Sequence, residues 1–447
     1  MVRPLQRSTQ LKGELLQGIT DKMEEKDRLF DILRKEKSRG RVQGIFIGIG
    51  IVVFIGLSAI LWYAVGMGFY RFFTTGAAFH KSRVIGARES EKLAVLNDII
   101  EEYYLDEYEE SDLKESMYKG YVAGLDDPYS QYYTKSEFAE LMEDNSGSFE
   151  GIGVYLNVNQ ENRTLEVIRP IEGSPAEKAG IKEGDIIVEV DGEDIVGQDS
   201  DIVISKMRGE KGTTVNVGVL REGEDEILRF DIVRDVVESV TVNSEMLDGD
   251  IGYLSLSEFA EVSYDQFRLQ LNQLKEKGMK ALIFDLRSNT GGDFDIAVKI
   301  ADKFCPEGLV VYIEDKDGNR EEYDSDADML GLPLVVLVNG YSASSSEIVT
   351  GAIKDYGVGT IMGTTTYGKG VVQRVLPLGD GSGMKVTIAK YYTPNGYNIH
   401  GVGIEPDEVV EWDYEKYRDE DIDNQLEAAK EYLEKELKSG DKGASEK

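Results

Sequence analysis

Cysteine and histidine are nearly absent from this chain, and their scarcity removes several kinds of site. The 447 residues include one cysteine, Cys305, and two histidines, His80 and His400. A single cysteine excludes an internal disulfide framework and any zinc or iron–sulfur site built on several cysteines. Two histidines leave almost no material for a Ser-His-Asp or Cys-His catalytic group, or for a histidine-rich metal centre.

Positive charge is also scarce. Lys and Arg number 50 against 84 Asp and Glu, which gives a net charge of −34. Phosphate backbones are bound by basic stripes, so this balance argues against a nucleic-acid-binding protein. The apolar content of 41% and the charged content of 30% are typical of a globular chain rather than a disordered one. The length corresponds to about three domains at roughly 150 residues each.

One segment contains no charge at all. Residues 42–70 are 29 uncharged residues between two arginines, which is more than the ~20 residues needed to cross a bilayer core. Trp62, Tyr63 and Tyr70 cluster at its distal end, where interfacial aromatics are expected. A cleaved signal peptide is the alternative, but 41 residues precede the segment, far more than the charged region of a signal. We predict a single transmembrane helix.

The flanking charges predict the orientation of this helix. Residues 27–41 hold six cations and residues 67–90 hold four, a modest bias that favours a cytoplasmic N-terminus. Residues 1–41 carry a net charge of +4, so the rest of the chain carries −38. We expect a cytoplasmic tail over 1–41, a linker over 71–84 and a large acidic part outside the cell membrane.

The next segment, residues 85–145, has helical periodicity. One apolar stripe with 3.6-residue spacing begins at Leu93 and another at Met117. The run 124–130, Gly-Leu-Asp-Asp-Pro-Tyr-Ser, interrupts the pattern with residues typical of turns. We predict a helical N-terminal part of the folded region.

Residues 146–236 have the pattern of a small β-rich module. The run Gly151-Ile152-Gly153-Val154 precedes an alternating strand, and residues 174–180 form a short capped helix with Pro early and Gly just past its end. Residues 184–192 then contain strand segments and a tight Asp-Gly turn. This order resembles a PDZ domain.

The PDZ resemblance implies capture of a peptide C-terminus at Gly151, Ile152, Gly153 and Val154. Exposed N–H groups of the last three can form a nest for a carboxylate, and a peptide strand can add to the sheet edge. Taken alone, the run is more typical of an ordinary glycine-rich strand entry, and the downstream Ser-Pro-Ala and Gly-Asp segments reverse that preference.

Strands and helices alternate over residues 237–410. We predict a strand at 251–256, a helix from Ser263 with Gln266 completing a capping box, and a buried strand at 281–286. Strand–turn–helix order places loops at one end of a sheet, where sites form. The acidic tail 411–447 is predicted to be helical and to pack its sparse apolar stripe on the core or on a second subunit.

Ser344 follows a buried strand and opens a predicted helix, so its hydroxyl would lie at the positive end of a helix dipole. Neighbouring backbone N–H groups would suit an oxyanion. The alternative is structural, since Ser344 and Glu347 have the spacing of a capping box, and most such serines only cap a helix.

Lys369 lies between two glycines and is the candidate general base. Burial would bring its pKa down from ~10.4 toward neutrality, as a serine–lysine pair requires. Gln373 would share a face with it in a helical turn and hold it in place. A solvated loop lysine is the ordinary alternative. A P-loop over 363–370 is a further one, but Gly370 replaces the Ser or Thr that would bind magnesium.

In combination, these motifs resemble those of the C-terminal processing peptidases, the tail-specific protease family of PDZ-containing serine peptidases. The similarity covers roughly residues 85–437. It is carried by four runs in addition to the PDZ pattern: residues 124–130, Asp285-Leu-Arg-Ser-Asn-Thr-Gly-Gly292, Val338-Asn-Gly-Tyr-Ser-Ala-Ser344, and Tyr367-Gly-Lys-Gly-Val-Val-Gln373.

The resemblance implies roles for five residues: Ser344 as nucleophile, Lys369 as base, Gln373 as its support, and the backbone N–H groups of Gly292 and Ser345 as oxyanion donors. Position 345 is usually Ala in the family. The extra hydroxyl leaves the choice of nucleophile open among the serines at 342, 344, 345 and 346.

The implied fold is α+β multidomain: one N-terminal transmembrane helix, a PDZ domain inserted into an α/β protease core of ClpP/crotonase-like type, and helical N- and C-terminal extensions. The implied function is a serine endopeptidase that cleaves near a substrate's C-terminus. Its expected partners are the membrane and proteins or peptides with accessible C-termini, with a possible homodimer and no cofactor.

Three readings compete with or limit this expectation. The main alternative is a non-catalytic, membrane-tethered PDZ scaffold for peptide binding. His400, without an evident acidic partner, is interpreted as structural. The acidic run 324–328 lacks the Gly and distal Glu of a calcium loop and is interpreted as a solvated turn.

Overall fold

The computed structural model describes residues 86–159 and 163–445. The chain divides into two compact units, Met1–Glu107 and Tyr108–Lys447. The described part of the first unit contains helix α2 (Ala87–Tyr103), which has no buried residue. The predicted membrane helix at 42–70, the tail and the linker lie outside the described residues. Within the described ranges, no helix has the length and apolarity needed to cross a membrane.

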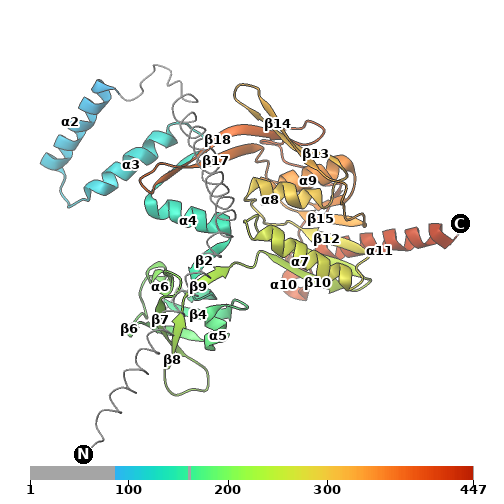
Figure 1. Ribbon diagram of the computed structural model, residues 1–447, viewed down its shortest axis with the longest axis horizontal. Coiled ribbons are helices and arrows are strands. Elements are labelled where there is room, and N and C mark those ends of the chain that lie inside the picture. Colours follow the sequence, from blue (N-terminus) through green and yellow to red (C-terminus); the bar gives the residue numbers. More distant parts are fainter. Residues whose placement is uncertain (1–85, 160–162, 446–447) are drawn as a thin grey trace, which may run out of the picture. The chain divides into compact units, whose positions relative to one another are not determined.

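A six-stranded sheet forms the centre of the second unit (Figure 1). Its order is β10 (Val242–Leu247), β11 (Ile251–Leu256), β12 (Ala281–Asp285), β15 (Leu334–Val338), β16 (Thr360–Gly363) and β19 (Glu408–Val409). β10 is antiparallel to β11, and all other neighbours are parallel. β12 and β15 are buried at every position, as expected for parallel strands that are covered on both faces.

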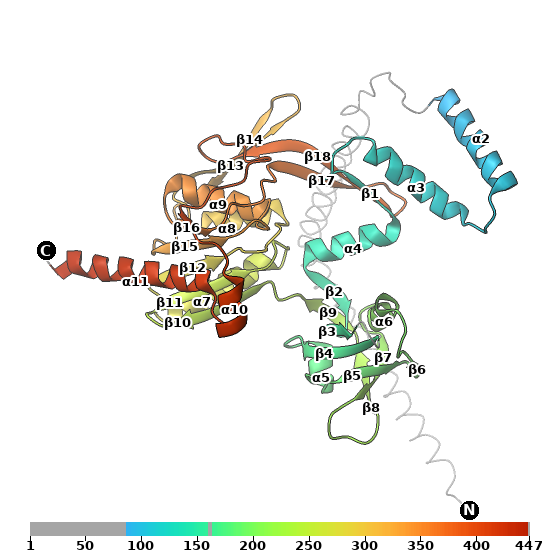
Figure 2. The same cartoon turned by 180° about the vertical axis from the view of Figure 1, so that it is seen from behind.

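Helices cover both faces of this sheet (Figure 2). They are α7 (Ser263–Glu276), α8 (Phe294–Asp302) and α9 (Ser345–Tyr356) on one face and α11 (Asn424–Ser445) on the other. Leu282 and Phe284 face the first group, whereas Ile283 packs with Ala429 and Leu433 of α11. This follows from the alternation of side chains along a strand. The acidic tail is helical as predicted, and of its two predicted packing partners the structure shows the core of the same chain.

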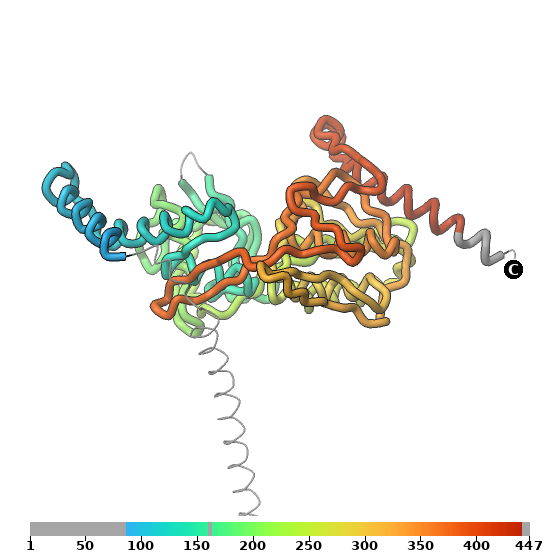
Figure 3. Tube along the Cα trace, turned by 90° about the horizontal axis from the view of Figure 1, so that it is seen from above, coloured from blue at the N-terminus to red at the C-terminus, as the bar shows by residue number. Residues whose placement is uncertain are grey.

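A second, antiparallel sheet lies in the same unit. Its strands are β1 (Gln131–Tyr133), β13 (Gly308–Asp315), β14 (Arg320–Ser325), β17 (Val371–Pro377) and β18 (Gly383–Tyr392). The β17–β18 hairpin extends to the N-terminal segment, where β1 pairs with β18 (Figure 3). Residues 85–145 are therefore not wholly helical: α3 (Glu110–Ala123) and α4 (Lys135–Ser146) flank a strand that forms only because a distant strand is available.

The β-rich module begins and ends on one two-stranded ribbon, in which β2 (Ser148–Gly151) pairs with β9 (Asp235–Glu238). The elements between them are β3 (Val154–Asn159), β4 (Thr164–Pro170), α5 (Pro175–Ala179), β5 (Ile186–Val190), β6 (Glu193–Asp194), α6 (Ser200–Met207), β7 (Thr214–Leu220) and β8 (Leu228–Val233). They enclose a separate hydrophobic core that includes Val167 and Val217. The predicted Asp-Gly turn joins β5 to β6, with positive φ at both Asp191 and Gly192.

Two local predictions are wrong. Ser263 does not cap α7, because it is already the first helical residue and its hydroxyl donates to Glu258 O. Gln266 instead accepts the N–H of Thr241. Residues 369–373 do not form a helical turn, since β17 begins at Val371. In both places, longer-range partners use the groups that the local pattern assigned to a helix.

Candidate active site

Ser344 lies between β15 and α9 in a conformation that is unusual for a residue with a side chain. Its φ is +54° and its ψ is −113°, a region that costs energy and is kept only where the surroundings enforce it. Gly291 packs directly against it, since a Cβ at Gly291 would lie 2.8 Å from the Ser344 Cβ. The serine is thus held on a strained turn at the N-terminal end of a helix, where the helix dipole is positive.

Hydrogen bonds distinguish the four candidate serines. Ser342 donates to Leu286 O at 2.7 Å, and Ser346 donates to Asn289 O at 2.9 Å. Ser345 donates to the carbonyl oxygens of Gly292 and Asp293 at 3.0 and 3.2 Å. The hydroxyl of Ser344 bonds to no other residue in the described part of the chain, and it does not cap α9. Of these four hydroxyls, only that of Ser344 is therefore free to react.

One buried carboxylate connects the two proposed catalytic segments. Oε2 of Glu347 accepts the backbone N–H of Ser344 at 2.9 Å and that of Lys369 at 2.8 Å. Oε1 accepts the Gly368 N–H at 2.7 Å and the Thr366 hydroxyl at 2.6 Å. A residue predicted only as half of a capping box thus fixes the backbone of Ser344 beside that of Lys369.

The amine of Lys369 is partly buried beside an aromatic ring. Its Nζ lies 5.1 Å from the ring centre of Tyr129. Burial lowers the pKa of Lys369 below its ordinary value, and the positive charge of Lys385 lowers it further, against the carboxylates of Glu347 and Asp127. The environment therefore favours the neutral amine that a general base requires. In the described structure the amine makes no hydrogen bond to the Ser344 hydroxyl.

Gln373 does not hold Lys369 directly. Its side-chain amide donates to Val371 O at 3.3 Å and to the Thr387 hydroxyl at 3.4 Å. The same segment excludes a P-loop, because Lys369 leads into strand β17 instead of a helix.

The two expected oxyanion donors lie next to each other and beside Ser344. The Ser345 hydroxyl donates to the Gly292 carbonyl. Neither the Gly292 N–H nor the Ser345 N–H has an intramolecular acceptor in the described structure. Gly292 has a φ of +140°, and a Cβ there would lie 2.3 Å from Phe259 O. Only glycine therefore fits at this position, and the arrangement suits a tetrahedral oxyanion.

The expected peptide-binding residues lie where the β2–β9 ribbon enters the β-rich module. Gly151 ends β2, and Gly153 has a φ of +80° before β3 begins at Val154. Gly153 O accepts one hydrogen bond from the N–H of Ile171 and another from the hydroxyl of Ser174, the residue just before α5. β3 pairs with β4 on one side only, which leaves its other edge open to an added strand.

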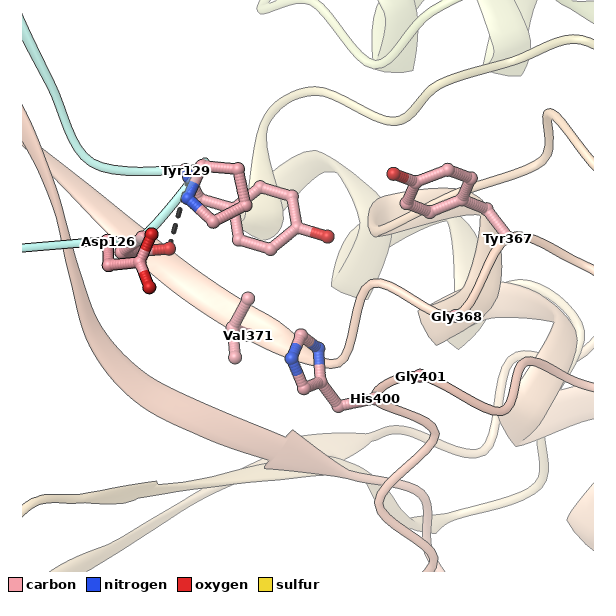
Figure 4. A pocket seen from close by; sticks show the side chains of 9 residues that line it. Asp126, Tyr129, Tyr367, Gly368, Val371, His400 and Gly401 are labelled. Atoms are coloured by element: carbon pink, nitrogen blue, oxygen red, sulfur yellow. Dashed lines mark hydrogen bonds between the residues drawn. The ribbon is translucent and has the colours of Figure 1, made fainter. Parts of the chain in front are cut away.

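The sequence alone did not identify Tyr129 as part of the site. Its loop, residues 124–130, lies beside Gly368 and His400 around a pocket of about 590 Å³ (Figure 4). His400, interpreted as structural from the sequence, lines this pocket too, with its ring 6.2 Å from that of Tyr129. The turn-rich motif was recognisable in the sequence, but its distance along the chain from Lys369 concealed the contact.

Family models match two parts of this chain. A model of the PDZ domain matches residues 151–232, and a model of peptidase family S41 matches residues 250–410. The carboxy-terminal-processing protease of Bartonella bacilliformis is 36% identical over 343 residues, covering 74% of this chain and 78% of that protein. The carboxyl-terminal-processing protease of Synechocystis sp. is 37% identical over 295 residues, covering 65% and 69%.

Two further similarities extend the comparison. Carboxy-terminal processing protease CtpA of Bacillus subtilis is 35% identical over 370 residues, covering 82% of this chain and 76% of that protein. The solved structure of the photosystem II D1 C-terminal processing protease is 30% identical, covers 71% of this chain and 86% of its own, and has a TM-score of 0.42. This chain belongs to the C-terminal processing protease family, the PDZ-containing serine peptidases of peptidase family S41.

Proposed function

We propose that Ser344 and Lys369 form the catalytic pair of this peptidase. Lys369 takes the hydroxyl proton as Ser344 attacks the peptide carbonyl, and it then protonates the leaving amine. The N–H groups of Gly292 and Ser345 stabilise the oxyanion. Water then attacks the acyl-enzyme while Lys369 takes one of its protons, and Lys369 returns that proton to the Ser344 oxygen as the carboxylic acid is released. The cycle needs no cofactor.

The observation that carries this proposal is the shared carboxylate oxygen of Glu347. A single atom accepts the N–H of both Ser344 and Lys369, so the two backbones cannot separate without breaking a buried hydrogen bond. Gln373 is the proposed positioning residue. Its contact with Thr387, whose N–H donates to the Ser130 hydroxyl, supports a role in holding the Tyr129 loop.

The proposal is tested by hydrolysis of an unstructured polypeptide, with its products read by mass spectrometry. Ser344→Ala and Lys369→Ala are expected to lower kcat by at least about a thousandfold. Ser136→Ala and Lys390→Ala, both at exposed positions, are the matched controls and keep the wild-type rate. Wild-type activity in either site variant rejects the assignment.

For substrate recognition, we propose that the β-rich module binds the last residues of a protein or peptide substrate. Support comes from the free edge of β3 and from the glycine-containing turn at 151–153 that precedes it. Cleavage then occurs near that end. A non-catalytic scaffold on the same fold would bind such peptides without cleaving them, so the polypeptide assay separates the two functions.

We also propose that the chain is anchored by a membrane helix over 42–70, with its N-terminus in the cytoplasm and the peptidase outside. The uncharged stretch and the cation bias around it support this. Carbonate extraction of membranes, followed by protease treatment of intact cells, tests both parts.

A homodimer is the proposed oligomeric state, supported by the apolar residues Leu93, Leu96 and Ile99, which α2 leaves exposed. The molar mass of the detergent-solubilised full chain by light scattering tests it. A monomer at micromolar concentration rejects it.

A further inference from the structure

The pocket beside Lys369 is built jointly by two distant parts of the chain. Residues 126–129 form one wall, and the loops at 367–371 and 400–401 form the other. The first wall lies outside both ranges that the family models match, 151–232 and 250–410. The active-site region therefore includes a surface that neither domain model accounts for.

This wall is held firmly in place. The Ser130 hydroxyl donates to Asp127 Oδ2 at 2.6 Å and accepts the Thr387 N–H at 3.0 Å. Asp127 Oδ1 accepts the Tyr129 N–H at 3.1 Å. The following strand β1 is paired along its length with β18. The pocket is thus formed before any substrate arrives, as most small binding sites are.

Its lining has a definite chemistry. Pro128, Tyr129, Tyr367 and Val371 supply apolar and aromatic surface. Asp126 and Asp127 are the acidic residues of the lining, and His400 also belongs to it. Figure 4 shows the hydroxyls of Tyr129 and Tyr367 directed toward each other. A volume of about 590 Å³ is ample for a natural side chain.

We propose that this pocket receives the substrate side chain on the leaving-group side of the scissile bond, and that it selects an uncharged side chain with apolar surface over an acidic one. The inference rests on the proposed function, because it takes Lys369 as the group that protonates the leaving amine. The Tyr129 ring that faces this amine also lines the pocket. A leaving fragment within reach of the amine therefore has its first side chain beside the pocket.

The electrostatics give the direction of the selectivity. Asp127 keeps its negative charge at neutral pH: burial opposes ionisation, but hydrogen bonds from Ser130, Thr387 and Tyr129 lower its pKa overall. A carboxylate brought into this pocket would meet Asp127 and the exposed carboxylate of Asp126. Like charges at short range in a partly buried site disfavour binding by about tenfold or more.

The test uses a polypeptide substrate with a fixed C-terminal tail and a single cleavage site. The residue after the scissile bond is Leu, Gln or Glu, and a second series varies the residue before it in the same way. We expect the wild-type chain to cleave the Leu and Gln substrates at least about tenfold faster in kcat/KM than the Glu substrate in the first series.

Two pocket variants and one control complete the experiment. Asp126→Asn removes one carboxylate and keeps a residue that tolerates the local φ of +54°. It should reduce discrimination against Glu severalfold. Tyr367→Ala, at a side chain that is 57% exposed, should lower kcat/KM for Leu relative to Gln. Tyr397→Ala, an exposed tyrosine away from the pocket lining, should leave the profile unchanged.

The other outcomes of this experiment overturn either the pocket assignment or the proposed catalytic pair. An unchanged profile in both pocket variants, or a change confined to the residue before the scissile bond, overturns the pocket assignment while Ser344→Ala remains inactive. Hydrolysis that survives Ser344→Ala overturns the proposed catalytic pair instead.

Discussion

At the residue scale, the site depends on how each polar atom near Ser344 is used. Three neighbouring serines donate to loop carbonyls, and Glu347 accepts four hydrogen bonds from two segments. The result is one unbonded hydroxyl on a strained backbone, on a segment that Glu347 joins to the backbone of Lys369. Small changes to these atoms should therefore separate catalytic effects from structural ones.

Ser345→Ala should behave very differently from Ser344→Ala. The variant removes the hydroxyl that bonds to Gly292 and Asp293 but keeps the backbone N–H that is proposed to hold the oxyanion. We expect a loss of about 1 kcal/mol in the free energy of unfolding and a decrease in kcat of less than about tenfold. Urea unfolding and steady-state kinetics check it. A decrease as large as that of Ser344→Ala would contradict the assignment of the nucleophile.

The pH dependence should respond to Lys385. The groups that face the Lys369 amine are Lys385, Glu347, Asp127 and the Tyr129 ring. The positive charge of Lys385 lowers the pKa of Lys369, so Lys385→Gln raises that pKa. Because the base must be neutral, kcat/KM rises with pH, and the rising limb should move to higher pH in the variant. Lys390→Gln, at an exposed position on the same strand, is the control. A limb that does not move contradicts the role of Lys369 as base.

At the element scale, the C-terminal helix is tied to the loop that carries Gly292. Arg287, which follows β12, bonds to Asp285 at 2.6 Å and to Asp423, just before α11, at 2.7 Å. The guanidinium is only 13% exposed and the Asp285 carboxylate 7%. A charged link buried to this extent joins two elements that are far apart along the chain.

Arg287→Ala should be strongly destabilising. Removing the guanidinium leaves the carboxylates of Asp285 and Asp423 close together without a counter-charge, which costs about 3–5 kcal/mol for a buried pair. Arg418→Ala is the matched control, since its pair with Asp419 is more than half exposed and should contribute less than about 1 kcal/mol. Thermal and urea unfolding of both variants test the difference. Equal stabilities would show that the Arg287 link is screened by water.

At the scale of the whole molecule, the second unit contains separate hydrophobic cores. The β-rich module has its own, whereas two others lie on the faces of the central sheet. The β2–β9 ribbon is a short paired connection at the start and end of the module. The proposed peptide-binding residues and the proposed catalytic residues therefore belong to parts of the chain with different hydrophobic cores.

This division predicts a dependence on the substrate's C-terminal carboxylate. We expect amidation of that carboxylate to lower kcat/KM by about tenfold or more, because the N–H groups near Gly153 lose a charged acceptor. The loss should appear as a higher KM. The products identified by mass spectrometry should change little. A chain with Gly153→Val, in which the new side chain collides with Ser174, should treat both substrates alike. Equal rates for both substrates in the wild-type chain would contradict the recognition proposal.

The sequence by itself determined the elements whose signals are local: the buried strands of the core, the glycine-marked turns, the order of the β-rich module and the strand–turn–helix that carries Ser344. Periodicity and turn chemistry depend on residues a few positions apart, so they can be recognised in the sequence before the fold is known. The tertiary structure alone decided which serine hydroxyl stays unbonded and that Glu347 holds two loops together. It also placed Gln373 on a strand and brought Tyr129 to the Lys369 amine. These outcomes depend on partners distant along the chain, and hydrogen bonding and burial assign such partners only once the chain has folded.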